Sequence, residues 1–537
     1  MSETLKVDLA PHHRAVLGLT MPEALDFASA EWGERTAIRE LEGQERSLTW
    51  SEFRTRVSML RSGLESVGVR PGDKIGVLFP NQIEFPLAWW AIVEAGAVIV
   101  PLNPKYTTRE ITFVLEDSDA SWLIGLGGLI DEHVVDGAVG GLGPDKLIAL
   151  GDSHTAGLSF DLLSAVPAAD RQHKAVPTDI VNIQFTSGTT GLPKGCLLTH
   201  QYWIELGVYG AALGGDPQRL LADHPFYYMQ NQAYMMTAVS CGAALLVTPG
   251  LSRRKFLDWL IDYEIDFAWV DEDMLEFPVS EKDRKLKLRK APVAGMPSEA
   301  YEPMEARFGI TCREWYASTE VGSGIVVPYD RRDLAGTGTM GFCLPNRESK
   351  IVDEFLDEVA PGVPGELCLR GSGMMLGYHN RPDVNAALFL PGGWFRTGDV
   401  ATKSEEGLHY FVGRTKDMIR RSGENISAAE VEMHLHGLAE IDDVAVVPVP
   451  DPDREEEVKA IVVPADGVSL TADDVVEWAR RGLAPFKVPR YVEFRAELPY
   501  TASGKIHKAS LRGEENPLHD GVTDTKTNHL GAAAAGL

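Results

Sequence analysis

Short apolar runs alternate with longer amphipathic stretches through the first part of the chain. Residues 74–79 and 97–102 are apolar runs of strand length, and the stretches before and between them have the spacing of helices, over about 48–68 and up to residue 95. The alternation continues to a further strand at 179–184 and a helix at 200–215. Strands that alternate with helices in this way indicate parallel, doubly wound sheets.

The pattern changes after about residue 309. Segments near 309–315 and 365–371 resemble strands without intervening long helices, which predicts a β-rich subdomain. From residue 417, strands at 444–449 and 458–463 alternate with helices that open at Ser427 and Thr471, each followed three residues later by an acidic residue. The predicted fold is therefore α/β: a large N-terminal domain of doubly wound sheets plus a β-rich subdomain, followed by a small α+β domain.

Composition and charge narrow the function. The 537 residues carry a formal net charge of −27, which argues against general nucleic-acid binding and against an anionic membrane surface. No signal peptide and no apolar run of about 18 residues is evident. The five scattered cysteines show no metal-ligand spacing, so free thiols in a reducing, cytoplasmic location are expected.

A glycine-rich loop follows the strand at 179–184. Its glycines let the backbone approach a ligand closely, and its hydroxyls and one ammonium are suited to holding a polyphosphate. The spacing is not that of a Walker A loop. The residues expected to bind phosphate are Thr186, Ser187, Gly188, Thr189, Thr190, Gly191 and Lys194.

This loop, Phe-Thr-Ser-Gly-Thr-Thr-Gly-Leu-Pro-Lys-Gly at 185–195, closely resembles the phosphate loop of the adenylate-forming superfamily, which includes acyl-CoA synthetases and adenylation domains. Four further motifs occur in the superfamily's order. They are Tyr-Ala-Ser-Thr-Glu at 316–320, Thr-Gly-Asp at 397–399, the Gly-Arg-Thr-Lys segment from 413, and Ser-Gly-Lys at 503–505. The resemblance spans roughly residues 20–512.

The resemblance implies a role for each matching residue. Tyr316, flanked by Ala317 and Ser318, would stack on adenine, and Thr319 would contact the α-phosphate. The remaining assignments are Glu320 for Mg²⁺, Asp399 for the ribose hydroxyls, Arg414 for ribose or phosphate, Lys416 as the hinge, Gly423 on the loop that lines the thiol tunnel, and Lys505 as the catalytic lysine. The implied cofactors are ATP (or an acyl adenylate or AMP), Mg²⁺ and coenzyme A.

The resemblance also implies domain limits and a reaction. Residues 1–415 would bind the adenylate and the acyl group, 416–512 would form a mobile C-terminal domain, and 513–537 a disordered tail. The implied function is an AMP-forming acyl-CoA synthetase, an ATP-dependent acid–thiol ligase. Its partners would be a small carboxylic acid or its adenylate and coenzyme A, with no nucleic acid and no membrane, and a homodimer is compatible with the resemblance.

Two places depart from the superfamily's usual pattern. Ala317 stands where Gly is usual, and the segment around Ala294 and Gly295 matches poorly. Added side-chain bulk beside the adenylate leaves open an enzyme that performs only the thioester-forming half-reaction. A stand-alone adenylation enzyme that loads a carrier protein is the other alternative. Tyr228, Met229, Ala294 and Gly295 are the expected substrate-pocket residues.

Overall fold

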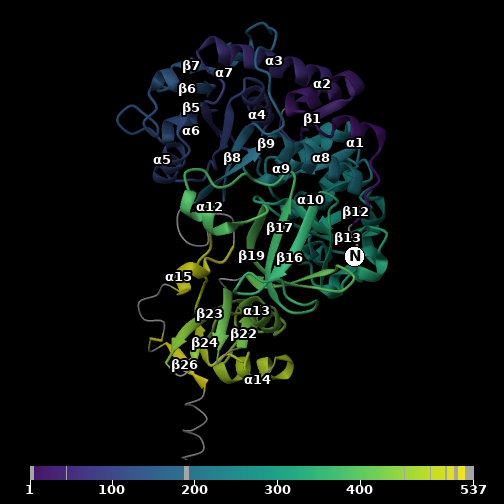
Figure 1. Ribbon diagram of the computed structural model, residues 1–537, viewed down its shortest axis with the longest axis vertical. Coiled ribbons are helices and arrows are strands. Elements are labelled where there is room, and N and C mark those ends of the chain that lie inside the picture. The colour runs from purple at the N-terminus through teal and green to yellow at the C-terminus, as the bar shows by residue number, and fades with distance from the viewer. Residues whose placement is uncertain are drawn as a thin grey trace, which may run out of the picture.

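The computed structural model describes most of the chain. The described residues are 5–43, 45–186, 193–414, 417–421, 424–452 (backbone only at 424 and 425), 454–483, 485–501, 505–512, 518–519 and 521–525. They form four β-sheets. Figure 1 shows three of these sheets in a large upper body and the fourth in a smaller body below it. The predicted division into a large and a small α/β unit is confirmed.

The seven-stranded sheet is parallel except at one edge, where β8 and β9 pair antiparallel. Its strands, in spatial order, are β7 (Leu158–Ser159), β6 (Leu147–Leu150), β5 (Ala120–Leu126), β3 (Lys74–Leu78), β4 (Val98–Pro101), β8 (Ile180–Thr186) and β9 (Lys194–Thr199). The neighbouring helices are α3 (Trp50–Ser66), α4 (Glu84–Glu94), α5 (Thr108–Asp117), α6 (Gly127–Glu132) and α7 (Phe160–Ser164).

Both faces of this sheet are covered, as the sequence predicts for a doubly wound arrangement. Along β3, Ile75 and Val77 point into the core cluster that contains α3 and α4, whereas Leu78 belongs to the cluster that contains α5. In β5, Trp122 and Leu123 divide between the same two clusters. Alternation between two cores explains why these strands are apolar along their whole length.

The four-stranded sheet has the order β10 (Arg219–Ala222), β11 (Ala244–Val247), β1 (Thr36–Glu40) and β2 (Ser47–Thr49). The helices around it are α1 (Pro11–Val16), α2 (Met21–Trp32), α8 (His200–Gly214), α9 (Met229–Cys241), α10 (Arg253–Asp262) and α11 (Tyr301–Phe308). The helix expected at 200–215 is therefore confirmed as α8.

The β-rich part is one continuous nine-stranded sheet rather than a separate small unit. Its order is β12 (Lys290–Val293), β13 (Thr311–Ser318), β14 (Gly322–Val326), β15 (Thr339–Cys343), β20 (His409–Arg414), β19 (Trp394–Lys403), β17 (Gly365–Gly371) and β16 (Arg347–Val352), with β18 (Phe389–Leu390) beside β19. Helix α12 (Pro382–Leu388) follows β17. The motif at 316–320 begins inside β13 instead of following it, because β13 continues to Ser318 against β14.

The C-terminal sheet contains β22 (Glu424–Ser427), β21 (Met418–Arg421), β24 (Glu455–Pro464), β25 (Tyr491–Phe494), β26 (Val522–Asp524) and β23 (Ile441–Asp451) beside β24. Helices α13 (Ala428–His436), α14 (Ala472–Gly482) and α15 (Lys508–Arg512) accompany it. Thr471 forms the expected capping box with Asp474. Strand β26 lies within the tail that the sequence predicts to be disordered, and it pairs antiparallel with β25, so this part of the tail belongs to the sheet.

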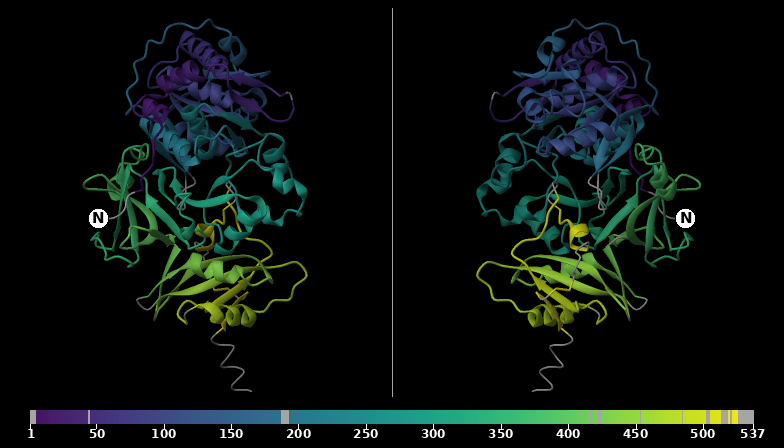
Figure 2. Two further views of the ribbon diagram at one scale, coloured as in Figure 1. Left: turned by 90° about the vertical axis from the view of Figure 1, so that its right-hand side faces the viewer. Right: turned by 90° about the vertical axis from the view of Figure 1, so that its left-hand side faces the viewer.

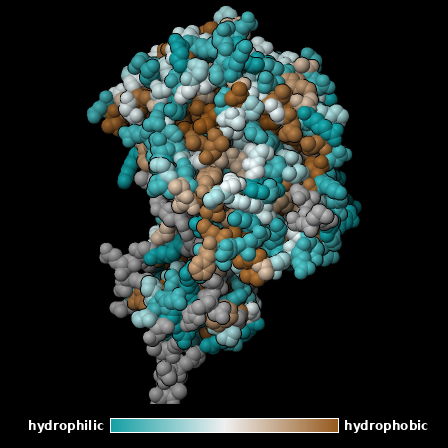
Figure 3. Space-filling view, in the orientation of Figure 1, coloured by the Kyte–Doolittle hydropathy of each residue, from teal (hydrophilic) through white to brown (hydrophobic). Residues whose placement is uncertain are grey.

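The molecular surface, the helices and the cysteines each add one finding. On the face shown in Figure 3, apolar side chains gather in patches over the large body, with hydrophilic side chains around them. Within the described ranges, helices fall short of the length and apolar character that a bilayer span requires. All five cysteines are buried and free, as expected from their spacing.

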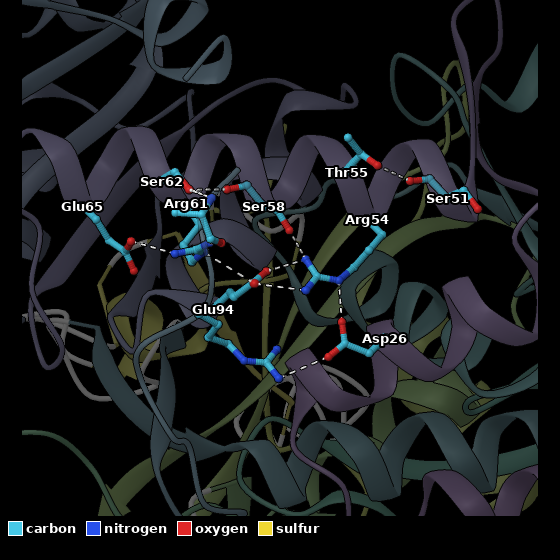
Figure 4. Close-up of polar contacts among 11 residues, drawn as sticks. Asp26, Ser51, Arg54, Thr55, Ser58, Arg61, Ser62, Glu65 and Glu94 are labelled. Carbon is cyan, nitrogen blue, oxygen red and sulfur yellow. Dashed lines mark hydrogen bonds and ion pairs between the residues drawn. The ribbon is translucent and has the colours of Figure 1, made fainter. Parts of the chain in front are cut away.

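A buried cluster of charges joins helices α2, α3 and α4 (Figure 4). The Glu94 carboxylate, only 2% exposed, accepts hydrogen bonds from Arg54 at 3.0 and 3.2 Å and lies 3.5 Å from Arg61 Nε. Arg54 also reaches Asp26 at 2.5 Å. Burial raises the pKa of Glu94, and both arginines act against that rise. The cluster therefore depends on keeping every charge paired.

Glu94→Ala should destabilise the large body by about 3–5 kcal/mol, because it leaves the buried Arg61 and the partly buried Arg54 without their shared carboxylate. Denaturant unfolding monitored by tryptophan fluorescence measures the change. Glu65→Ala is the matched control: Glu65 also pairs with Arg61, at 2.7 Å, but is 30% exposed, so its loss should change stability by less than about 1 kcal/mol. Equal effects of the two variants would contradict this interpretation.

Candidate functional site

The two ends of the glycine-rich loop are joined in a β-hairpin. Thr186 ends β8 and Lys194 begins β9; the two residues pair in register, and the Thr186 hydroxyl donates to the Lys194 carbonyl at 3.4 Å. Ser187, Gly188, Thr189, Thr190 and Gly191 lie outside the described residues. Because β8 is parallel to β4, the hairpin opens at the carboxyl edge of the sheet, where α/β proteins bind ligands.

The Lys194 ammonium lies over the ring of Tyr378, 4.9 Å from its centroid. Tyr378 in turn donates its hydroxyl to Glu320 Oε1 at 2.8 Å. The first motif and the 316–320 motif are thus connected through a side chain from a third segment. Tyr378 is not among the predicted site residues, because it lies outside the motifs that carry the resemblance.

Residues 316–320 turn from β13 into β14. The buried Tyr202 donates its hydroxyl to the Thr319 carbonyl at 3.0 Å, which fixes the backbone of the turn from the side of α8. The Thr319 and Glu320 side chains are partly exposed, and Ser318 is likewise partly exposed. A hydroxyl and a carboxylate are therefore presented together at this turn, close to the end of the phosphate loop.

Asp399 is held between Tyr316 and Arg414. The Tyr316 hydroxyl donates to Asp399 Oδ2 at 2.6 Å, and Arg414 Nε lies 2.6 Å from Oδ1. The side chains come from adjacent strands, because Asp399 in β19 pairs in register with Arg414 in β20. Gly398 has φ +74°, a left-handed conformation that turns the chain before the carboxylate. The geometry brings together three residues that the sequence placed on the nucleoside.

Burial raises the pKa of Asp399, which is 3% exposed, while Arg414 and the Tyr316 hydroxyl lower it. Burial and the adjacent carboxylate raise the pKa of Tyr316 well above its ordinary value, so its hydroxyl stays a donor. A buried carboxylate with one cation and one hydroxyl donor retains acceptor capacity for further hydroxyl groups. This arrangement is suited to a vicinal diol such as ribose.

The departures from the superfamily pattern lie at exposed positions. The methyl groups of Ala317 and Ala294 are both exposed. Gly295 has φ +69°, and its backbone N–H donates to Glu314 Oε2 at 3.0 Å. The effect of these side chains on a bound adenylate therefore stays a prediction.

The loop at 294–296 is held by a carboxylate that the sequence reasoning also missed. Glu314, in β13, accepts from the backbone N–H groups of Gly295 and Met296 and from the Tyr301 hydroxyl at 2.6 Å. Burial raises the pKa of Glu314, and the three donors act against that rise. The sequence signal was its position two residues before Tyr316, on the same face of the strand.

Tyr228 and Met229, the other pocket candidates, stand at the start of α9 and are half-buried. Asn103 donates to the Tyr228 hydroxyl at 3.2 Å. Behind them, Gln232 and Gln184 donate to the backbone carbonyls of Phe226 and Tyr227 at 2.7 and 2.8 Å. Buried amides thus fix the backbone that carries Tyr228.

Lys505 is exposed, and its backbone is hydrogen-bonded to Thr501. Its carbonyl accepts from the Thr501 N–H at 2.7 Å, and its own N–H donates to the Thr501 hydroxyl at 3.2 Å. Three residues further on begins α15, which lies between the large and small bodies in both views of Figure 2. Lys416 and Gly423 are outside the described residues.

The residues present fit a magnesium ion with bound phosphates. Mg²⁺ is usually held by one or two carboxylates together with substrate phosphate oxygens. Glu320 offers such a carboxylate, with its Oε1 engaged by Tyr378, beside a lysine and a loop suited to phosphate. Glu320 would therefore hold the ion.

A second group of side chains that could bind a metal lies within the described part of the chain. His12, His13 and Asp216 have ligand atoms within 4.8 Å of one another. However, His13 Nδ1 accepts the Ala10 backbone N–H at 3.1 Å, so a neutral His13 carries its proton on Nε2, which lies 2.7 Å from Asp216. A protonated Nε2 has no lone pair for a metal. These contacts connect α1 to Asp216, two residues after the end of α8.

Comparison with known proteins gives a consistent result. The family described as "AMP-binding enzyme" matches residues 25–379, and "AMP-binding enzyme C-terminal domain" matches 430–505. The crotonobetaine/carnitine–CoA ligase of Salmonella arizonae is 30% identical over 522 residues, covering 92% of this chain and 99% of the relative. The feruloyl-CoA synthase of an Amycolatopsis species is 33% identical over 480 residues, covering 87% and 94%.

Solved structures show the same fold. The o-succinylbenzoate CoA synthetase of Bacillus subtilis, in complex with its acyl-adenylate intermediate, superposes with a TM-score of 0.80 at 24% identity and covers 93% of this chain and 99% of that one. ATP-bound MatB from Rhodopseudomonas palustris gives a TM-score of 0.81 at 22% identity, with coverage of 93% and 99%.

Proposed function

We propose that this chain, which belongs to the AMP-binding enzyme family, is an AMP-forming acid–CoA ligase. In the first step a substrate carboxylate attacks the α-phosphorus of ATP, and pyrophosphate leaves. In the second step the thiolate of coenzyme A attacks the acyl carbon, and AMP leaves. The observation that carries the proposal is the Tyr316–Asp399–Arg414 cluster, a preformed diol acceptor close to the phosphate loop.

Each described side chain has a place in the first step. Asp399 accepts hydrogen bonds from the ribose hydroxyls, and Tyr316 lies against the adenine. Thr319 and Lys194 donate to phosphate oxygens, where negative charge develops as pyrophosphate leaves. Mg²⁺, when bound at Glu320, would neutralise charge on the phosphates. Lys505 bridges the carboxylate and the α-phosphate and stabilises the charge that accumulates between them.

The second step requires a different set of groups. Rotation of the C-terminal domain about Lys416 removes Lys505 and brings the loop of Gly423 toward the thiol. The boundary is compatible with this motion, since β20 ends at Arg414 in the nine-stranded sheet and β21 begins at Met418 in the C-terminal sheet. The proposal therefore includes a division of the chain into two domains, residues 1–415 and residues 416–512.

The chemistry of the pocket candidates limits the range of possible substrate acids more than the names of the relatives do. The relatives act on crotonobetaine or carnitine and on a feruloyl group, which differ in charge and aromaticity. The pocket candidates Tyr228 and Met229 are aromatic and thioether groups, which favour an acid with an apolar or aromatic body.

A mass-spectrometric screen tests the function directly. Carboxylic acids are incubated with ATP and Mg²⁺, with coenzyme A or a phosphopantetheinyl carrier protein as the acceptor, and adenylate and thioester are both measured. Acyl-CoA as the main product supports the proposal. Thioester on the carrier alone would replace coenzyme A as the acceptor, and thioester only from supplied adenylate would reduce the enzyme to the second half-reaction.

Lys416→Pro should block the change between the two half-reactions, because proline fixes φ near −65° at the proposed hinge. The variant should keep the half-reaction that matches its fixed orientation and lose most of the other. Pyrophosphate exchange measures adenylation, and thioester formation from synthetic adenylate measures the second step. Normal rates in both assays would place the hinge elsewhere.

A further inference from the structure

Residues 375–379, which we call the strap, connect the two motifs that bracket the phosphates. The strap's backbone pairs with β9: Leu376 donates to the Leu197 carbonyl at 2.9 Å, and His379 donates to the Gly195 carbonyl at 2.8 Å. At its other end, Met375 donates to the Glu320 carbonyl at 2.9 Å. The strap therefore fixes the exit of the phosphate loop relative to the turn that carries Glu320.

The Tyr378 side chain makes the same connection between charged groups. Its hydroxyl donates to Glu320 Oε1 at 2.8 Å, and its ring lies under the Lys194 ammonium. Tyr378 is 6% exposed. Because an ionised carboxylate only accepts hydrogen bonds, the Tyr378 hydroxyl is the donor in this contact.

Tyr378 is itself held from both sides of its peptide unit. The Asn385 side chain on α12 accepts from the Tyr378 N–H at 2.8 Å and donates to the Tyr378 carbonyl at 2.9 Å. Gly377 has φ +145°, and a Cβ there would lie 3.1 Å from the Asn385 amide. The next residue, His379, lies 2.9 Å from Asp119. These contacts leave Tyr378 little freedom to adopt another orientation.

We propose that Tyr378 is a positioning residue that orients the Glu320 carboxylate toward the metal of the bound nucleotide and sets its distance from Lys194. The inference rests on the proposed function and goes beyond it, because no contact between Tyr378 and substrate is needed. A donor on Oε1 fixes the carboxylate plane and leaves Oε2 to face the phosphates. The tyrosine thus acts through Glu320 and Lys194, on the metal-bound nucleotide and not on AMP.

The test compares nucleotide binding with and without Mg²⁺ by calorimetry. The probe is an ATP analogue with a methylene group between the α- and β-phosphorus, which binds without reacting, and AMP is the second ligand. Tyr378→Phe keeps the ring under Lys194 and removes only the donor. It should lower the Mg²⁺-dependent gain in analogue affinity about 10- to 150-fold, the scale of a lost hydrogen bond to a charged group. AMP affinity should stay within about twofold.

Tyr301→Phe is the matched control. It removes a hydroxyl donor from another partly exposed carboxylate, Glu314, at a tyrosine of similar exposure, 9%. The Mg²⁺-dependent gain should be unchanged in this variant. If Tyr378→Phe retains the wild-type gain, the positioning role is wrong, although the wild type still binds the analogue with Mg²⁺ and the proposed function stands. A wild type that binds neither nucleotide would overturn both.

Asn385→Ala keeps the Tyr378 hydroxyl but releases the peptide unit that aims it. This variant should reduce the same Mg²⁺-dependent gain by a smaller factor than Tyr378→Phe. If Tyr378→Phe does not fold, as judged from circular dichroism and AMP binding, Asn385→Ala decides the question. An unchanged gain in Asn385→Ala would then refute the inference.

Discussion

Lys505→Ala should slow acid-dependent pyrophosphate exchange by about 10²- to 10³-fold, the scale on which one transition-state charge contact acts. The expected site of action is the bond between the carboxylate and the α-phosphate, where two anions approach each other. Lys505 is exposed, with contacts to Thr501 within its own loop, so its removal should leave the stability of the C-terminal domain nearly unchanged.

The second half-reaction distinguishes a catalytic loss from a general one. Thioester formation from supplied acyl adenylate should fall by less than about threefold, because Lys505 has rotated away by that step. Lys505→Arg keeps the charge but changes its geometry and should recover only part of the exchange rate. Lys287→Ala, at another exposed lysine, is the control for loss of one positive charge. Equal losses in both half-reactions would remove the assigned role of Lys505.

Asp399→Ala is expected to weaken AMP binding by about 2–4 kcal/mol, or about 30- to 1000-fold. The variant loses the acceptor for both ribose hydroxyls, and it also leaves the Tyr316 hydroxyl and the Arg414 guanidinium without their shared partner. Calorimetric titration with AMP measures the change. Asp399→Asn preserves the shape and one acceptor oxygen, so it should lose less affinity than the alanine variant.

A structural explanation for the loss must be excluded in the same experiment. Thermal unfolding of Asp399→Ala should stay within a few degrees of wild type, because Arg414, the cation that loses its partner, has a side chain that is 52% exposed and can be hydrated. Unchanged AMP affinity in this variant would rule out ribose binding by Asp399. Reduced affinity together with extensive unfolding would point instead to a structural role.

The motif residues could be located from sequence because each motif is local. Tyr316, Asp399 and Arg414 come from three segments, and each was recognised from the order of a few neighbouring residue types. Their mutual contacts, however, depend on the pairing of β19 with β20 and on the path of β13, which no local pattern encodes. The long strands and the amphipathic helices, in contrast, were predictable, because the periodic pattern within a single segment is enough to define each of them.

The contacts that sequence reasoning missed join distant segments. Tyr378 lies 58 positions from Glu320, and nothing in Met-Leu-Gly-Tyr indicates a carboxylate partner. Strand β26 was missed because its three residues stand in a polar tail, and only the free edge of β25 makes them a strand. Short strands gain their stability from the partner rather than from their own propensity.

In the proposed mechanism, the position of Arg414 couples nucleotide occupancy to domain orientation. Arg414 contacts Asp399 and is also the last residue of β20, four residues before β21 of the C-terminal sheet begins at Met418. A domain rotation at this connection would move a residue that we propose contacts the nucleotide. By thermodynamic linkage, a ligand that favours one orientation changes the affinity for the nucleotide by a certain factor. The nucleotide must then change the affinity for that ligand by the same factor. The release of AMP and the binding of the thiol are then thermodynamically coupled.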